Sequence, residues 1–164
     1  MNRRESFKMA AGMAALLALS ACAKKKTDLA AGNGPGAAAV PGSEQDFTVN
    51  VGDRVFFLED QSTLTPEAQE TLRRQAAWLQ KYPPVTVQVE GHADERGTRE
   101  YNIALSARRA TATREFLIAQ GVTASRISSI AYGKERPAAL CDAEQCWSQN
   151  RRAVTVITGG ARTS

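Results

Sequence analysis

The amino-acid sequence predicts an α/β fold (an α+β sandwich) in which two main helices pack on one sheet of about four strands. Apolar residues alternate at Val85, Val87 and Val89, which is the period of a half-buried strand. After Gly97 the apolar spacing changes to that of a helix. Strand and helix patterns alternate along the chain, which is typical of helical crossovers between strands. We therefore expect a βαβαβ-type order with helices on one face of the sheet.

The first half of this domain contains one strand and one helix. The strand is expected at residues 53–58. Thr65 is a good N-cap and Pro66 suits the first helical position, so a helix should begin there. It should end at about Lys81, because the following pair of prolines at 83–84 cannot continue it. The expected buried stripe contains Leu72, Ala76 and Leu79, with Trp78 packing in the core or at its rim.

The second half contains three strands and the longer helix. A strand is expected at residues 85–90, and the helix that follows should run to Gln120, where Gly121 supplies the C-terminal cap. Two further strands are expected at residues 126–132 and 153–158. The buried stripe of the long helix is predicted to contain Ile103, Ala107, Ala110 and Leu117.

The N-terminal segment has the pattern of an export signal. Residues 1–8 are basic and residues 9–19 apolar, a run much shorter than the roughly 20 residues that a spanning helix requires. The sequence Leu-Ser-Ala-Cys ending at Cys22 resembles the lipobox of bacterial lipoproteins, in which the cysteine is acylated. The alternative is ordinary signal-peptide cleavage beside an incidental cysteine. We expect a signal peptide at residues 1–21, a lipidated Cys22 with a flexible Ala, Gly and Pro tether at residues 22–46, and a folded domain at residues 47–160.

Composition favours a single domain and argues against nucleic-acid binding. The 164 residues suffice for one core, and the formal net charge is +4. Cleavage before Cys22 removes three basic residues and one acidic residue, which lowers the charge from +4 to +2. Most of the basic character therefore belongs to the signal, and nucleic acid is not an expected partner.

Two of the three cysteines lie close together in a predicted loop. Cys141 and Cys146 are five residues apart in a chain that we expect to be exported, where oxidation to a disulfide is the usual outcome. We predict that they pair, which leaves Cys22 for lipid. A metal site is the competing interpretation, but His92 is the one histidine in the sequence, so no metal is expected.

The candidate site is the segment from Gly91 to Ala110, GHADERGTREYNIALSARRA, which joins the end of a strand to a helix. Asp94 lies in the turn and Arg109 lies in the helix. Two opposite charges at one rim suit a zwitterion, whose ammonium would bind Asp94 and whose carboxylate would bind the planar guanidinium of Arg109. The alternative is an ion pair between these two residues that only fixes the turn.

These residues resemble the OmpA-like family of peptidoglycan-binding domains, in the form found in the peptidoglycan-associated lipoproteins. The resemblance covers residues 51–157 and includes YGKERP at 132–137 and NRRAV at 150–154. It implies an OmpA-like fold without cofactor, and that Asp94 and Arg109 bind diaminopimelate in the peptidoglycan stem peptide. It also implies the Tol-Pal system with TolB as a partner. Ala23 after the lipidated cysteine implies the outer membrane, with the domain facing the periplasm.

Three further residues match family positions near the ligand. Asp60 follows the first strand, at a position that the resemblance assigns to the pocket. Glu59 stands where the family usually has an aromatic residue, and it could instead accept a hydrogen bond from the ligand's ammonium. Leu105 could equally be a core residue, and Asn102 could equally form a hydrogen bond between the helix and the turn. Arg151 and Arg152 match as well, but two arginines beside a strand are more often a solvated edge.

The sequence does not predict an enzyme. His92, Asp94 and Ser106 come nearest to a hydrolytic triad, yet Ser106 is expected in mid-helix and not at a strained turn. His92 is expected to hydrogen-bond the neighbouring backbone. The predicted function is a binding module that links the outer membrane to the cell wall and supports envelope integrity and division. The alternative is a scaffold lipoprotein that binds envelope proteins without gripping peptidoglycan.

Overall fold

A four-stranded sheet forms the centre of the domain. The structure is a computed structural model that describes residues 39–163. The strands are β1 (Arg54–Phe56), β2 (Thr86–Gly91), β3 (Ile127–Ala131) and β4 (Arg152–Gly159). Their order in the sheet is β1-β4-β2-β3. The four strands that the sequence predicts are therefore confirmed, each to within about two residues at its ends.

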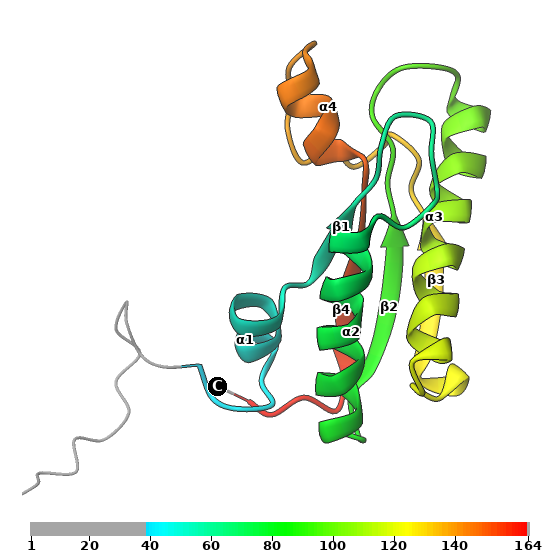
Figure 1. The fold of residues 1–164 in the computed structure, drawn as a ribbon. Coiled ribbons are helices and arrows are strands. Elements are labelled where there is room, and N and C mark those ends of the chain that lie inside the picture. The colour runs from blue at the N-terminus through cyan, green and yellow to red at the C-terminus, as the bar shows by residue number, and fades with distance from the viewer. Residues whose placement is uncertain (1–38, 164) are drawn as a thin grey trace, which may run out of the picture. The chain divides into compact units, whose positions relative to one another are not determined.

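The last strand of the chain is inserted between the first two. β4 pairs antiparallel with both β1 and β2, while β2 and β3 are parallel. The two long helices, α2 (Pro66–Lys81) and α3 (Arg99–Ala119), connect β1 to β2 and β2 to β3. Both lie on the same face of the sheet (Figure 1). The expected α/β architecture with one covered face is confirmed.

The core lies between α2, α3 and the sheet. Thr65 caps α2 by accepting a hydrogen bond from the amide of Ala68, as predicted. The predicted stripe of α2 is buried, as is Trp78, whose ring packs 4.9 Å from that of Phe47. A fully buried leucine, valine or phenylalanine among them contributes about 1.5 to 3 kcal/mol of hydrophobic stabilisation. The residues that α2 and β2 bury together are Leu72, Ala76, Leu79, Val87 and Val89.

The buried face of α3 differs from the predicted apolar stripe. Ile103 and Ala107 are only partly buried, whereas Ala110 and Leu117 are buried as expected. The other fully enclosed side chains of α3 are mostly polar, namely Asn102, Ser106, Arg109 and Thr113. Apolar spacing could not reveal this face, because Asn102, Ser106 and Arg109 are polar residues that are buried with hydrogen bonds to backbone groups of neighbouring turns.

Ordered structure begins before the expected boundary at Phe47. Ser43 caps the short helix α1 (Glu44–Asp46), which continues into a π-helical turn at Phe47–Val51. Asp46 accepts a hydrogen bond of 2.8 Å from the indole of Trp78, so this segment packs against α2. The expected signal peptide at residues 1–21, Cys22 and the tether as far as residue 38 lie outside the described residues. No helix within residues 39–163 is both long and apolar enough to cross a membrane.

A short helix precedes the last strand, where the sequence suggested only a loop. This helix, α4 (Glu144–Asn150), lies beyond one end of the sheet (Figure 1). Cys146 belongs to it and forms a disulfide with Cys141, with a Cα–Cα distance of 5.6 Å. The disulfide thus joins α4 to the loop before it. A single 3-10 turn, η2 (Ala124–Arg126), leads into β3.

Candidate functional site

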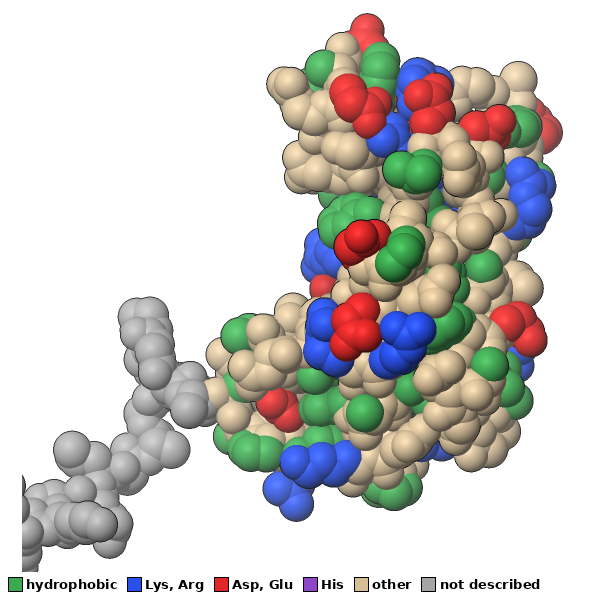
Figure 2. All heavy atoms as spheres, in the orientation of Figure 1, with side chains coloured by type: hydrophobic (Ala, Val, Ile, Leu, Met, Phe, Trp, Pro, Cys, Tyr) green, Lys and Arg blue, Asp and Glu red, His purple; other side chains and the backbone are tan. Residues whose placement is uncertain are grey.

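The predicted site residues gather at the end of the domain where α4 lies. The turn after β1, the turn between β2 and α3, and α4 all meet there (Figure 1). Acidic and basic side chains are interspersed over this end (Figure 2). Charges of both signs therefore surround the turn that carries Asp94.

A close approach between β2 and α3 sets the position of this turn. A Cβ atom at Gly91 would lie 1.9 Å from the carbonyl oxygen of Ser106, so only glycine fits there. The Ser106 hydroxyl is fully buried, accepts from the amide of Gly133 at 2.9 Å and donates to the carbonyl of Ile103 at 3.0 Å. Both of its hydrogen-bonding roles are used by backbone groups, so Ser106 joins α3 to the loop after β3.

A pocket of about 220 Å³ opens between these elements. It brings together four of the five predicted ligand-binding residues, which come from the turn after β1, the turn after β2 and the first half of α3. The residues that line it are Glu59, Asp60, Asp94, Arg96, Gly97, Tyr101, Asn102 and Leu105. A zwitterionic group would therefore meet three carboxylates and one guanidinium at its walls.

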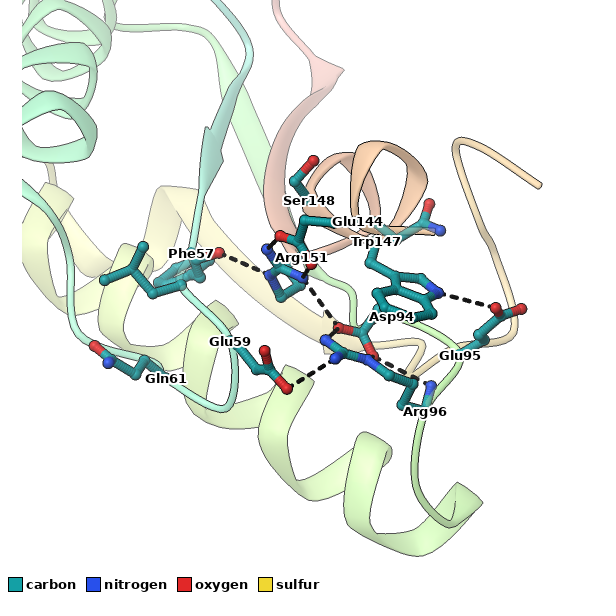
Figure 3. A network of polar contacts seen from close by, with 12 residues as sticks. Phe57, Glu59, Gln61, Asp94, Glu95, Arg96, Glu144, Trp147, Ser148 and Arg151 are labelled. Atoms are coloured by element: carbon teal, nitrogen blue, oxygen red, sulfur yellow. Dashed lines mark hydrogen bonds and ion pairs between the residues drawn. The ribbon is translucent and has the colours of Figure 1, made fainter. Parts of the chain in front are cut away.

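Asp94 is the buried carboxylate of the pocket, and two arginines bind it. Arg96 donates to it from Nη2 at 2.7 Å, from Nε at 3.3 Å and from its own backbone amide at 3.1 Å. Arg151 donates from Nη1 at 3.4 Å (Figure 3). Burial alone would raise the pKa of the Asp94 carboxyl, but the hydrogen bonds from Arg96 and Arg151 outweigh it and hold the pKa below its usual value. Asp94 is therefore ionised at neutral pH.

Arg109 lies behind the pocket with no exposed surface. Its guanidinium donates to three backbone carbonyls, those of Gln61 at 2.8 Å, His92 at 2.9 Å and Leu58 at 3.2 Å. It thereby joins α3 to the turns after β1 and β2. Burial lowers the pKa of Arg109 to about 10, so it is still a cation at neutral pH. Within residues 39–163 its direct partners are neutral, which leaves its positive charge without a carboxylate in contact.

The two residues of the predicted pair therefore have separate partners. An ion pair between Asp94 and Arg109, the alternative that the spacing allowed, is not formed among the described residues. Electrostatic attraction to Asp94 still raises the pKa of Arg109 against the effect of burial, so the two charges are near one another. A ligand carboxylate placed beside Arg109 would supply the missing negative charge.

The remaining predicted residues have individual roles. Asp60 is exposed and has a φ of 55°, in the left-handed region that Asp tolerates in turns. Asn102 is buried and donates to the carbonyl of Arg96 at 2.7 Å, which fixes the turn after β2. Leu105 is buried and forms part of the apolar wall of the pocket.

Glu59 is at the rim, and its carboxylate accepts a bond of 2.8 Å from Arg96. The same guanidinium lies over the ring of Trp147, 4.2 Å from its centroid, and the Trp147 indole donates to Glu95 at 2.9 Å (Figure 3). Arg96 is thus in contact with two carboxylates and one aromatic face. Trp147 of α4 contacts the pocket only through Arg96, whereas Tyr101 of α3 is the aromatic residue that lines the pocket itself.

Sequence reasoning missed Arg96, Trp147 and Arg151 as site residues. The interpretation of Arg151 and Arg152 as a solvated edge is wrong, since both side chains are buried. Arg151 also donates to the carbonyl of Phe57 at 3.2 Å and pairs with Glu144 (Figure 3). The sequence did offer a reason to include Arg96, because it lies two residues from Asp94. It offered no reason to place α4 beside the site, because the position of α4 depends on how the chain packs.

His92 is buried beside the site, and the hydrogen bond expected for its ring is not formed. Neither ring nitrogen has a hydrogen-bond partner among the described residues, although Nε2 lies 3.6 Å from a carboxylate oxygen of Glu90. Burial, together with repulsion from Arg152 and Arg136, lowers the pKa of His92 to about 4. The ring is therefore neutral at physiological pH.

A larger cavity of about 830 Å³ lies elsewhere, beside α1 and the C-terminal end of β4. None of the predicted ligand-binding residues lines it, and its charged lining residues are Glu44 and Arg162. Size alone therefore does not identify the site, and the smaller, more highly charged pocket is the better candidate.

Comparison with known proteins assigns the chain to a family. Residues 56–152 match the model of the OmpA family. The curated relatives include peptidoglycan-associated lipoproteins of Brucella melitensis, at 59% identity over 89% of both chains, and of Agrobacterium fabrum, at 60% identity over 90% of this chain and 85% of the other. A third, from Rhizobium meliloti, is 62% identical over 87% of this chain and 83% of the other.

Solved structures agree with this assignment. A crystal structure of the peptidoglycan-associated lipoprotein of Burkholderia pseudomallei superimposes with a TM-score of 0.66 at 34% identity, covering 70% of this chain and 98% of that one. The C-terminal domain of Helicobacter pylori MotB gives 0.61 at 25% identity, covering 65% and 84%. With the family match, the close relatives and the shared fold, this chain belongs to the OmpA family and, within it, to the peptidoglycan-associated lipoproteins.

Proposed function

We propose that this protein binds diaminopimelate-containing peptidoglycan stem peptides non-covalently in the pocket between Asp60, Asp94 and Leu105. The observation that carries the proposal is the pair of separated opposite charges, an ionised Asp94 in the wall and a buried Arg109 cation whose direct partners are neutral. Diaminopimelate ends in an ammonium and a carboxylate on one carbon, which complements that pair. The names of the relatives support the same reading.

The chemistry favours recognition by charge and shape without catalysis. Asp94 and Asp60 accept hydrogen bonds from the ammonium, while Arg109 attracts the carboxylate from behind the wall. Leu105 contacts the methylene chain. Charge-assisted contacts of this kind contribute about 1.5 to 3 kcal/mol each, which corresponds to roughly ten- to hundredfold in affinity.

The place of the domain in the cell follows from the N-terminal segment. In this proposal Cys22 is acylated and anchored in the outer membrane, the tether spans part of the periplasm, and the domain binds peptidoglycan of the cell wall. The likeness to peptidoglycan-associated lipoproteins supports membership of the Tol-Pal system, with TolB as partner and a role in envelope integrity and division. If TolB uses the same face, TolB and a muropeptide should compete, and a stable ternary complex would contradict this.

The test is a calorimetric titration of the mature chain carrying Cys22→Ser, which remains unacylated. The ligands are a diaminopimelate-containing muropeptide and its lysine-containing counterpart, which lacks the terminal carboxylate. We expect selective binding of the first, reduced at least tenfold by Asp94→Asn. Equal binding of both ligands, or unchanged binding by the variant, would refute the assignment of the site.

A second function is favoured by one observation. Asp94 has cationic partners within the domain itself, as a purely structural carboxylate would. The protein would then be a scaffold for other envelope proteins, with no affinity for peptidoglycan. This alternative is supported if the folded protein binds neither muropeptide but does bind TolB in solution.

A further inference from the structure

Arg96 contacts the Asp94 carboxylate that a ligand ammonium would need. Its Nη2 and Nε atoms contact both oxygens of Asp94, at 2.7 Å and 3.3 Å, in a fork-like arrangement (Figure 3). A carboxylate offers about four acceptor positions, and Arg151 and the Arg96 amide use others. An incoming ammonium must therefore displace part of this arrangement before it can bind.

The two arginines on Asp94 differ in how firmly they are held. The side chain of Arg151 is 6% exposed and is fixed by the carbonyl of Phe57 and by Glu144. The side chain of Arg96 is 34% exposed, and the partners it would keep are Glu59, itself 65% exposed, and the ring of Trp147. Arg96 is therefore the partner that can leave Asp94, because its other contacts lie at the solvent side of the pocket.

We propose that Arg96 is an exchangeable latch on Asp94, which the ligand's ammonium replaces while Glu59 and Trp147 retain the displaced side chain. This inference rests on the proposed function of the same pocket. Exchanging one cation for another keeps the partly buried Asp94 neutralised throughout, so the carboxylate never becomes a bare buried charge. Arg96 then competes with the ligand and lowers its affinity.

Glu59 has a defined part in this exchange. A displaced Arg96 carries its positive charge beside the ammonium that replaced it, and Glu59 compensates that charge. Replacing Glu59 should therefore weaken binding only while Arg96 is present. The alternative is that Glu59 accepts a hydrogen bond from the ammonium directly, in which case its loss weakens binding whether or not Arg96 is there.

The experiment measures affinity for a diaminopimelate-containing muropeptide in the unacylated mature chain and four variants. These are Arg96→Gln, Glu59→Gln, the double variant and, as a matched control, Arg99→Gln. Arg99 is an exposed arginine that pairs with Glu135 outside the residues that line the pocket. Circular dichroism and thermal unfolding check that each variant is folded.

The latch predicts that Arg96→Gln binds about three- to tenfold more tightly and Arg99→Gln binds unchanged. Glu59→Gln should bind about three- to tenfold more weakly, and it should have no effect when combined with Arg96→Gln. Weaker or unchanged binding by Arg96→Gln would overturn the latch. An equal effect of Glu59→Gln in both backgrounds would overturn the role of Glu59.

The affinities of the wild-type protein and of Arg96→Gln together separate failure of the latch from failure of the proposed function. If neither wild-type protein nor Arg96→Gln binds the muropeptide, the function proposed for the pocket fails, and the latch with it. If the wild type binds and Arg96→Gln binds more weakly, only the latch fails.

Discussion

Arg151 at the end of α4 donates to Asp94 across 57 positions of sequence, with Nη1 3.4 Å from Oδ2. The Arg151 side chain is buried at this contact. It also donates a hydrogen bond to the carbonyl of Phe57 and forms an ion pair with Glu144. The Arg151 side chain, which the sequence suggested to be part of a solvated edge, therefore joins α4, the turn after β1 and the carboxylate of the pocket.

Arg109→Ala should destabilise the domain as well as abolish ligand binding. Removing the guanidinium leaves the buried carbonyl of His92 and the partly buried carbonyls of Leu58 and Gln61 without their donor. We expect a loss of about 2 to 4 kcal/mol in the free energy of unfolding, measured by urea denaturation. Arg108→Ala is the matched control, because its side chain is exposed on the same helix. Equal losses in the two variants would contradict the role given to Arg109.

His92→Leu should reduce the loss of stability on acidification. The folded pKa of about 4 lies below the usual histidine pKa of 6.5, so the unfolded chain binds the proton more readily between these values. Wild-type stability should therefore fall as the pH drops from 6.5 to 4, by at most about 1.4 kcal/mol per pH unit from this group. The leucine side chain of the variant has a volume similar to that of histidine but carries no titratable group. Parallel stability curves for the two proteins would show that His92 is not responsible.

Asp94→Asn should change stability in a pH-dependent way. The pKa of the carboxyl is lowered in the folded state, so its stabilising contribution is present above the unfolded value of 3.8 and is lost as the pH falls through the folded pKa. Thermal unfolding temperatures of the wild type and the variant should differ at pH 7, and the difference should shrink as the pH falls through the lowered folded pKa of Asp94. A difference that does not shrink on acidification would contradict ionisation as the cause.

Replacing both Cys141 and Cys146 by serine should weaken α4 and the pocket together. Closing this small loop is expected to contribute about 2 kcal/mol by the chain-entropy relation. The loss should also reduce muropeptide affinity, since α4 carries Glu144 and Trp147 and is followed directly by Arg151. Thiol labelling of the oxidised wild-type protein should find neither sulfur free. Lower stability with unchanged affinity would show that α4 is held in place by other contacts.

Gly91→Ala tests the close approach of β2 and α3. The added Cβ would lie 1.9 Å from the carbonyl oxygen of Ser106, and backbone cannot yield as a flexible side chain can. We expect destabilisation of about 1 to 3 kcal/mol, measured by urea denaturation. Gly52→Ala offers a comparison, because its nearest neighbour is a Thr71 side-chain carbon at 3.6 Å and its strain comes from a φ of 91° alone. A smaller loss at Gly91 than at Gly52 would contradict the close packing.

The regular elements of the domain could be predicted because local sequence contains the reasons for them. Thr65 and Pro66 start α2, the alternating valines define β2, and Gly121, with a φ of 95°, follows the end of α3. The acidic turn residue Asp94 was found for the same reason, since it directly follows a strand. The short helices α1 and α4 were missed, because a helix of three or seven residues has too little pattern to detect.

Local sequence patterns were enough to predict the family, the alternation of strands and helices, and four residues that line the pocket, namely Asp60, Asp94, Asn102 and Leu105. They did not predict that β4 lies between β1 and β2, that Arg109 bonds three carbonyls, or that Arg96 and Arg151 share Asp94. Periodicity in a sequence reports only which face of an element is apolar. Which buried charge meets which partner depends on contacts between segments far apart in the chain, and these exist only once the sheet has formed.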